Sequence, residues 1–311
     1  MNNEMKSVLA GAAVAGMLIA PALADPNWVT WPHKTYDELH RVAINDVVGA
    51  ITIDVKDSGP IAFDASGVKG AMNGLDVSTD DGTLAIEGSH EKSLVWDWRN
   101  WFNFTDVNQP SHSKLNLHLV VPKGTNIDID ELVGDATIGD TMGKIDFSAT
   151  ATKAKIGHVA SAKITMEGTG EAHVAQVDGP LIISIEGSGK VTAGKSGSVK
   201  ADLEGSGEAN LGAIEGGLNL EIDGSGALSA TRVNGPVKID VAGAGEVKIA
   251  DGVADPFHVE IAGAGDIDFG GIAVNPHIEA VGAGSVHIRA YRGHLDNEGM
   301  ADVKADTKVG P

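Results

Sequence analysis

Cysteine is absent from this chain of 311 residues, and aromatic residues make up only 4% of it. Without cysteine the protein has no disulfide, no thiolate nucleophile and no cysteine-ligated metal. Positive charge is also scarce, because 23 Lys and Arg residues stand against 43 Asp and Glu residues, for a formal net charge of −20. This balance argues against nucleic acids and anionic membranes as partners, since both are neutralised by Lys and Arg.

Long apolar runs are missing, and the one short run lies at the N-terminus. Lys6 precedes the apolar stretch 8–20, and Ala22-Leu23-Ala24 fits the small-residue pattern of a signal-peptidase site. The stretch is too short to span a membrane. Residues 1–24 are therefore predicted to be a signal peptide. The mature protein is expected in the periplasm or at the cell surface, with no membrane insertion.

Glycine, in contrast, is abundant at 41 residues, and much of it recurs at a nearly fixed interval. Successive Gly-X-Gly signatures, in which X is Ser, Ala or Thr, are spaced by 19, 18, 19, 19, 20 and 19 residues. Such a period is typical of a solenoid, in which each repeat forms one coil stacked on the last. The first glycines of the signatures are the predicted structural corners: Gly168, Gly187, Gly205, Gly224, Gly243, Gly263 and Gly282.

Apolar and polar residues alternate on both sides of each signature. Val237, Ile239 and Val241 precede one corner, and Val247 and Ile249 follow it. This period-two alternation predicts two strands per coil with one inward face, joined at a glycine that can adopt a positive φ. The predicted fold is all-β: a single-stranded, right-handed parallel β-helix, or solenoid, with an irregular N-terminal β region.

The repeat also divides the chain into parts. Residues 25–38 are polar, contain two prolines and are predicted to be a linker. Residues 39–123 form the N-terminal β region, 124–293 the coils and 294–311 a polar tail, with no helix expected after the signal peptide. A short third side of each coil is expected to be anchored by a further apolar residue, such as Ile214, Val233, Val253 or Ile272.

Three segments together resemble a known family. These are Leu117 to Gly124 (LHLVVPKG), Val133 to Gly139 (VGDATIG) and Val281 to Val286 (VGAGSV), alongside the glycine repeat. From Leu39 to Arg289 the chain resembles the bacterial "putative auto-transporter adhesin head GIN domain" family, also called DUF2807. The resemblance implies an exported β-helix of Gram-negative envelopes with a proposed role in adhesion. The shared motifs are structural, so they indicate a fold more strongly than an activity.

An acidic residue recurs three positions before successive corners. If the apolar partners point inward, these carboxylates form a column on the outer face, where stacked like charges repel. Calcium binds oxygen ligands of this kind, although the calcium-binding nonapeptide of other β-helices is absent. A solvated acidic face is the favoured interpretation, no cofactor is expected, and calcium is the alternative. The residues are Asp202, Glu221, Asp240, Glu260 and Glu279.

Aromatic residues gather in one short segment. Two interpretations remain open: a loop that packs over the solenoid, or an exposed patch that stacks against a sugar or another partner. Packing is favoured because an exposed tryptophan cluster is costly. The candidate ligand-binding residues are Trp96, Trp98, Trp101, Phe102 and Phe104.

Two further motifs have simpler structural explanations. The run from Gly189 to Ser196 matches the phosphate-loop pattern, but it is followed by strand-like alternation where that loop needs a helix. His258 and His277, beside Glu260 and Glu279, suggest zinc, although surface histidines without ligand spacing are far commoner.

The functional expectation is therefore a non-enzymatic envelope or surface protein, an adhesin-like module that binds a protein or glycan on a β-helix. The near-constant interval leaves no long excursion that could build a catalytic cleft. One alternative is a carbohydrate-active enzyme that uses Trp96 to Phe104. The other is a structural envelope protein that forms homo-oligomers through its coil ends.

Overall fold

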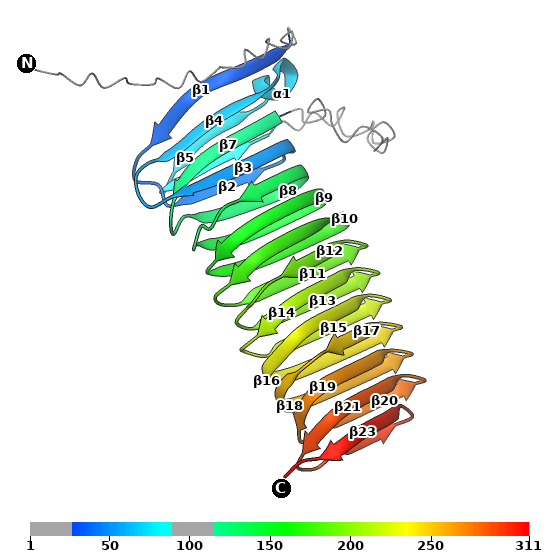
Figure 1. The fold of residues 1–311 in the computed structure, drawn as a ribbon. Coiled ribbons are helices and arrows are strands. Elements are labelled where there is room, and N and C mark those ends of the chain that lie inside the picture. Colours follow the sequence, from blue (N-terminus) through cyan, green and yellow to red (C-terminus); the bar gives the residue numbers. More distant parts are fainter. Residues whose placement is uncertain (1–26, 89–114, 311) are drawn as a thin grey trace, which may run out of the picture.

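The computed structural model describes residues 27–88 and 115–310. The chain is nearly all-β, with 76% strand and one short helix, and it winds into a parallel β-solenoid of about 10 turns. Figure 1 shows the coils stacked in chain order from β8 (Asn126–Ile138, green) to β23 (Asp302–Lys308, red). The fold class predicted from the glycine repeat is confirmed. No helix in the described ranges is long and apolar enough to cross a membrane.

The N-terminal part contains strands of both orientations and one helical turn. Its elements are β1 (Trp28–Tyr36), β2 (Arg41–Asn45), β3 (Val48–Lys56), β4 (Ile61–Val68), α1 (Lys69–Asn73), β5 (Asp76–Asp80), β6 (Thr83–Glu87) and β7 (Leu115–Pro122). β2 and β3 lie parallel to β8, and on their other side they pair with β6 and β7. Three pairs of strands are antiparallel: β4 with β7, β1 with β4, and β5 with β6.

From β8 onward every pairing is parallel, and each coil lies directly against the next. The strands are β9 (Lys144–Val159), β10 (Ser161–Val177), β11 (Leu181–Gly187), β12 (Lys190–Ala193), β13 (Val199–Gly205), β14 (Glu208–Ile214), β15 (Leu218–Gly224), β16 (Ala227–Gly243), β17 (Glu246–Ile249), β18 (Gly252–Gly263), β19 (Asp266–Val274), β20 (His277–Gly282), β21 (Ser285–Arg292) and β22 (Asp296–Gly299), followed by β23. Strands that run into a glycine corner form sheet A, as β11, β13 and β15 do. Strands that leave it form sheet B, as β12, β14 and β17 do.

The corner glycines pair with one another in a single column along one edge. All seven have positive φ, between 102° and 139°. After every corner from Gly187 to Gly282, the next N–H donates to the corner glycine carbonyl of the preceding coil, as Ser225 does to Gly205 at 2.7 Å. The second glycines have a different role, because they are buried at the corner. A Cβ at Gly245 would lie 2.9 Å from Ile222 Cγ2 of the preceding coil.

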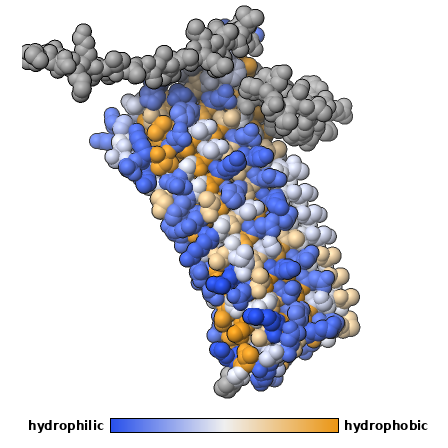
Figure 2. All heavy atoms as spheres, in the orientation of Figure 1, coloured by the Kyte–Doolittle hydropathy of each residue, from blue (hydrophilic) through white to orange (hydrophobic). Residues whose placement is uncertain are grey.

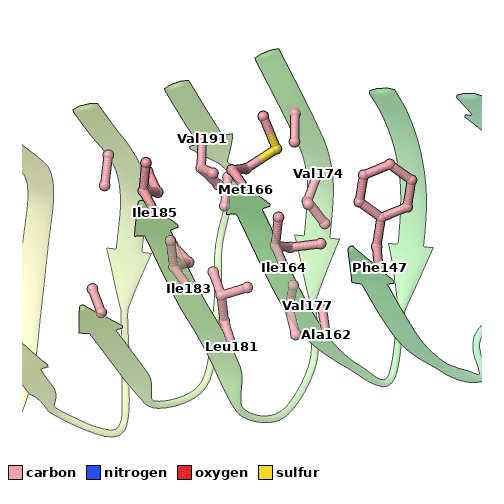
Figure 3. Close-up of a cluster of buried hydrophobic side chains, with 14 of the residues drawn as sticks. Phe147, Ala162, Ile164, Met166, Val174, Val177, Leu181, Ile183, Ile185 and Val191 are labelled. Carbon is pink, nitrogen blue, oxygen red and sulfur yellow. The ribbon is translucent and has the colours of Figure 1, made fainter. Parts of the chain in front are cut away.

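Inward side chains form continuous columns between the two sheets. Ile183, Ala201, Leu220 and Ile239 pair in register on successive coils, and all are fully buried. Figure 3 shows such residues of sheet A facing Val174 of sheet B across the interior. Burying one aliphatic side chain contributes about 1.5–3 kcal/mol. A single coil cannot bury its inner face alone, so this stabilisation is shared between neighbours.

The two ends of the solenoid differ. At the N-terminal end, the antiparallel strands β4 and β1 lie beyond β7, and Phe63 and Met72 are buried there. At the other end, among the described residues, β22 pairs only with β20 and β23 only with β21. Val303 and Ala305 of β23 are only partly buried against the core. The N-terminal end therefore finishes in antiparallel strands, of which β1 pairs only with β4, and the C-terminal end finishes in parallel strands whose outer edges have no partner among the described residues.

Three local features differ from the sequence-based expectation. Within the stretch expected to be linker, residues 28–36 form β1, and Pro32 falls at the register shift between Trp31 and Lys34, where a missing N–H is tolerated. The helix α1 is a single turn, too short to show a helical period. The tail contains β22 and β23, whose outward positions are polar because only one side of each strand faces the core.

The third side also has a different register at two positions. Ile214 and Val233 are fully buried as expected, but Val253 is 42% exposed and Ile272 is half-buried. Gly252, and not Val253, pairs with Val233. A Cβ at Gly252 would lie 1.9 Å from the Val233 carbonyl oxygen, so only glycine fits beneath that residue.

The corner column yields a stability prediction. We expect Gly224→Ala to destabilise the protein by about 1–3 kcal/mol, because φ is +124° there and the new Cβ would lie 2.6 Å from the Gly205 carbonyl oxygen. Gly70→Ala is the control, since a Cβ at this α1 position meets nothing within 4 Å. Urea unfolding followed by circular dichroism measures both. Equal stability of the two variants would contradict the role given to the corner.

Candidate binding face

The acidic residues predicted from the repeat form a real column on the outer face of sheet A. Asp202 pairs in register with Glu221 and Glu221 with Asp240, and the column continues through Glu260 to Glu279. Parallel strands lie about 4.8 Å apart, so these like charges repel one another. The outer face must therefore contain groups that offset this repulsion.

A column of cations lies beside the acids, two residues upstream on the same strands. Lys200 Nζ is 2.9 Å from Asp202 Oδ2, and Lys238 Nζ is 2.6 Å from Asp240 Oδ2. The Nε2 atoms of His258 and His277 each lie 2.8 Å from the carboxylate two residues downstream, Glu260 and Glu279 respectively. Residues two apart on a strand share a face, so each of these acids has its own cationic or hydrogen-bonding neighbour.

Glu221 is the exception, because Asn219 occupies the cation position of its coil. The hydrogen bond to Asp202 raises the pKa of Lys200, the hydrogen bond to Asp240 raises the pKa of Lys238, and the charge of Glu221 contributes to both. Glu221 is thus held between two lysines of adjacent coils. We call the two columns together, from Lys200 to Glu279, the charged ladder.

Most carboxylates of the charged ladder already have a cationic or hydrogen-bonding partner. Among residues 27–88 and 115–310, no group of three or more His, Asp and Glu side chains has an arrangement that could hold one. Calcium on the acidic column would have to displace Lys200 and Lys238 from their carboxylates. Zinc at His258 and His277 would have to displace their hydrogen bonds to Glu260 and Glu279.

An open groove of about 640 Å³ runs across several coils beside the cation column. Its lining is mostly apolar and includes Pro180, Pro236 and Pro256, with Lys200 and Lys238 also contributing. Gly216 and Gly217 also line it. Figure 2 shows that the visible outer surface around the coils is mostly hydrophilic, with scattered apolar residues. The groove is therefore an apolar surface next to an ordered row of charges.

Histidines bridge neighbouring coils at the C-terminal end. His277 lies 3.0 Å from Asp296 through Nδ1 and 2.8 Å from Glu279 through Nε2, and its ring stacks on that of His258 with centroids 5.0 Å apart. On sheet B, His287 lies 3.0 Å from Asp268 and 3.1 Å from Asp306. Hydrogen bonds, chiefly to Glu279 and Asp268, raise the pKa of His277 and His287 respectively.

The other candidates from the sequence have different outcomes. The aromatic residues Trp96, Trp98, Trp101, Phe102 and Phe104 lie outside the described residues, as does the predicted signal peptide.

The run from Gly189 to Ser196, which matches the phosphate-loop pattern, does not have the structure of a phosphate loop. Residues 190–193 form β12, and Ser196 is buried and forms a β-bridge with Ile214 of the next coil. The residues that follow form strand β13, not a helix.

Sequence comparison identifies no relative. No family model matches the chain, and no curated protein is similar to it. Solved structures do share its architecture. A Bacteroides fragilis protein described as a "putative adhesin" is 15% identical, covers 72% of this chain and 98% of its own, and superposes with a TM-score of 0.51. At this identity the likeness shows the fold alone.

Two Parabacteroides distasonis structures match over more of the chain but superpose less well. One, described as a "putative lipid binding protein", is 16% identical over 92% of this chain and 98% of its own, with a TM-score of 0.38. The other, described as a "putative adhesin", is 13% identical over 91% of this chain and 97% of its own, with a TM-score of 0.36.

Removing one cation should reveal the repulsion within the acidic column. We expect Lys238→Ala to lower the melting temperature, because Asp240 loses its partner and Glu221 and Glu260 lose a nearby positive charge. The loss should be larger at low ionic strength than at high, since salt screens exposed charges. Lys153→Ala, at an exposed position on sheet B, is the control. A melting temperature that changes equally at both salt concentrations would contradict this account.

The histidine bridges predict a pH dependence. A pKa raised on folding stabilises the protein below the ordinary histidine value of about 6.5, and this contribution is lost as pH rises through the folded-state pKa. We therefore expect His277→Gln and His287→Gln to lower the melting temperature more at about pH 6 than at about pH 9. Asn297→Gln, at an exposed position without a titratable group, is the control and should show no such difference. Equal losses at the two pH values would show that the bridges do not depend on protonation.

Proposed function

We propose that the protein is an exported, non-enzymatic envelope or surface protein that binds a protein or glycan ligand in the manner of an adhesin. The observation that carries this proposal is the long, regular outer surface. Coil follows coil from β9 onward with matched registers, and the groove crosses several of them beside the charged ladder. Such a surface suits an extended ligand better than a small reacting group held in a closed pocket.

The chemistry of the described side chains supports a binding role. Histidines such as His118, His158 and His287 bond to carboxylates, and these three residues are exposed or half-buried. A nucleophile activated by a histidine would need a hydroxyl at that position. The description of the B. fragilis protein as an adhesin and the resemblance to the GIN domain family agree with this proposal.

Within this proposal, the ligand lies along the groove. Its apolar parts would contact Pro180, Pro236 and Pro256, and its polar groups would reach Lys200 and Lys238 at the edge. Because both lysines already bond to carboxylates, they would supply specificity more than affinity. An extended peptide or a glycan chain fits this description.

Binding of the labelled full-length protein to panels of host glycans, matrix proteins and peptidoglycan tests the proposal. We expect at least one binder, and we expect Asn219→Trp, which fills the groove, to weaken that binding about tenfold or more. Lys248→Trp on sheet B is the matched control and should bind like the unchanged protein.

Two outcomes would overturn the proposal. No binding to any panel member would remove the adhesin-like function. Release of reducing sugar from a polysaccharide panel, lost when Trp96, Trp98 and Trp101 are replaced by alanine, would favour the carbohydrate-active enzyme.

A further inference from the structure

The exposed end of the solenoid carries a self-complementary strand. β23 has the sequence DVKADTK, in which Asp302, Lys304, Asp306 and Lys308 alternate with smaller residues. These four side chains are exposed, whereas Val303 and Ala305 are partly buried against the core. In the part of the chain that the structure describes, β23 pairs only with β21, so its other edge presents unpaired backbone groups.

We propose that two copies of the chain associate tail to tail, through antiparallel pairing of β23 with β23 of the partner about a two-fold axis at Ala305. This pairing places Asp302 opposite Lys308 of the partner subunit and Lys304 opposite Asp306 of the partner subunit. With their symmetry mates, every charged residue of β23 then faces one of opposite sign. Val303 faces Thr307 of the partner subunit, and Ala305 faces its own copy, so the interiors of the two solenoids become continuous.

The register is specified by charge and by face. A shift of one residue would place inward side chains opposite outward ones. A shift of two residues in one direction pairs Asp302 with Asp306 of the partner subunit, and in the other direction it pairs Lys304 with Lys308 of the partner subunit. Like charges opposite one another destabilise a sheet. A shift of four residues again pairs opposite charges, but it leaves most of β23 without a partner. The register centred on Ala305 is the only one that pairs all seven residues of β23, and it combines matched faces with opposite charges.

Backbone geometry fits the same centre. The Asp302 N–H donates to the Gly284 carbonyl at 3.1 Å, so Asp302 directs its backbone groups toward β21. Backbone groups of successive strand residues point to alternate sides, which turns those of Val303 and Ala305 toward the free edge. Two Ala305 residues can then exchange both of their hydrogen bonds across the axis.

Other features of the molecule favour a closed dimer centred on β23. At the opposite end the outermost strand, β1, contains Pro32 and a register shift between Trp31 and Lys34, so it is a poor partner for β23 and disfavours head-to-tail stacking into a filament. β22 is only four residues long, and its acids Asp296 and Glu298 would meet those of the partner. The proposed dimer contact is therefore formed by sheet B, through β23, and not by β22 of sheet A. Lys304 and Asp302 are 2.8 Å apart within one chain, so the charges are already ordered on the exposed face.

Sedimentation velocity of the full-length protein over a range of concentrations tests this inference. We expect a dimer whose dissociation constant rises about tenfold or more in Asp302→Lys and also in Lys308→Asp, because each change creates two like-charge contacts across the axis. The double variant, with both changes, restores opposite charges and should dimerise like the unchanged protein. Lys69→Asp, in α1 at the opposite end of the solenoid, is the matched charge-reversal control.

Circular dichroism melting checks that each variant folds. A protein that stays monomeric at every concentration overturns the inference, and so does a dimer that neither single variant weakens. Failure of the double variant to recover dimerisation also overturns it. This test is independent of ligand binding, since β23 lies outside the groove, so the adhesin-like function and the dimer can fail separately.

Discussion

In-register stacking of parallel strands is the constraint on which the rest of the structure depends. Strands about 4.8 Å apart must present equivalent residues at equivalent positions, coil after coil. Inward positions then become apolar columns, and corner positions become a column of glycines because φ is positive at each of them. Outward positions form columns too. An acidic residue that recurs at one position of the repeat therefore lies beside the acidic residue of the next coil, as Asp202 lies beside Glu221. The interior and the outer face are thus two consequences of one geometry.

The coil region could be predicted from the sequence because its determinants are local. The spacing of Gly168 to Gly282 and the alternation around each corner repeat often enough to define strands, corners and inward faces. The strand pairings of the N-terminal region could not be predicted, because they join segments that are distant in the sequence. For example, β3 lies between β7 and β8. Val253 shows a finer limit. Alternation alone could not show that Gly252 occupies the inward position beneath Val233.

The binding face was predictable in part. The acidic column follows directly from the repeat, and the cations that offset it also have a sequence signal, since Lys200, Lys238, His258 and His277 precede the acids by two residues on one strand face. The groove gave no such signal, because its lining residues come from several coils and include Pro180, Pro236 and Pro256, which are not part of the glycine repeat. The face therefore combines a row of acids, most of which have a cationic or hydrogen-bonding neighbour on the same strand, with an apolar groove.

The matched registers of β11, β13 and β15 have a consequence for the length of the molecule. Each coil touches only its two neighbours, and every boundary between coils uses the same kinds of contact. Adding or removing one whole unit of the glycine repeat would move the β23 end by one strand spacing and leave the cross-section unchanged. The length of the solenoid therefore depends on the number of repeat units, and it does not depend on which outward side chains each unit carries.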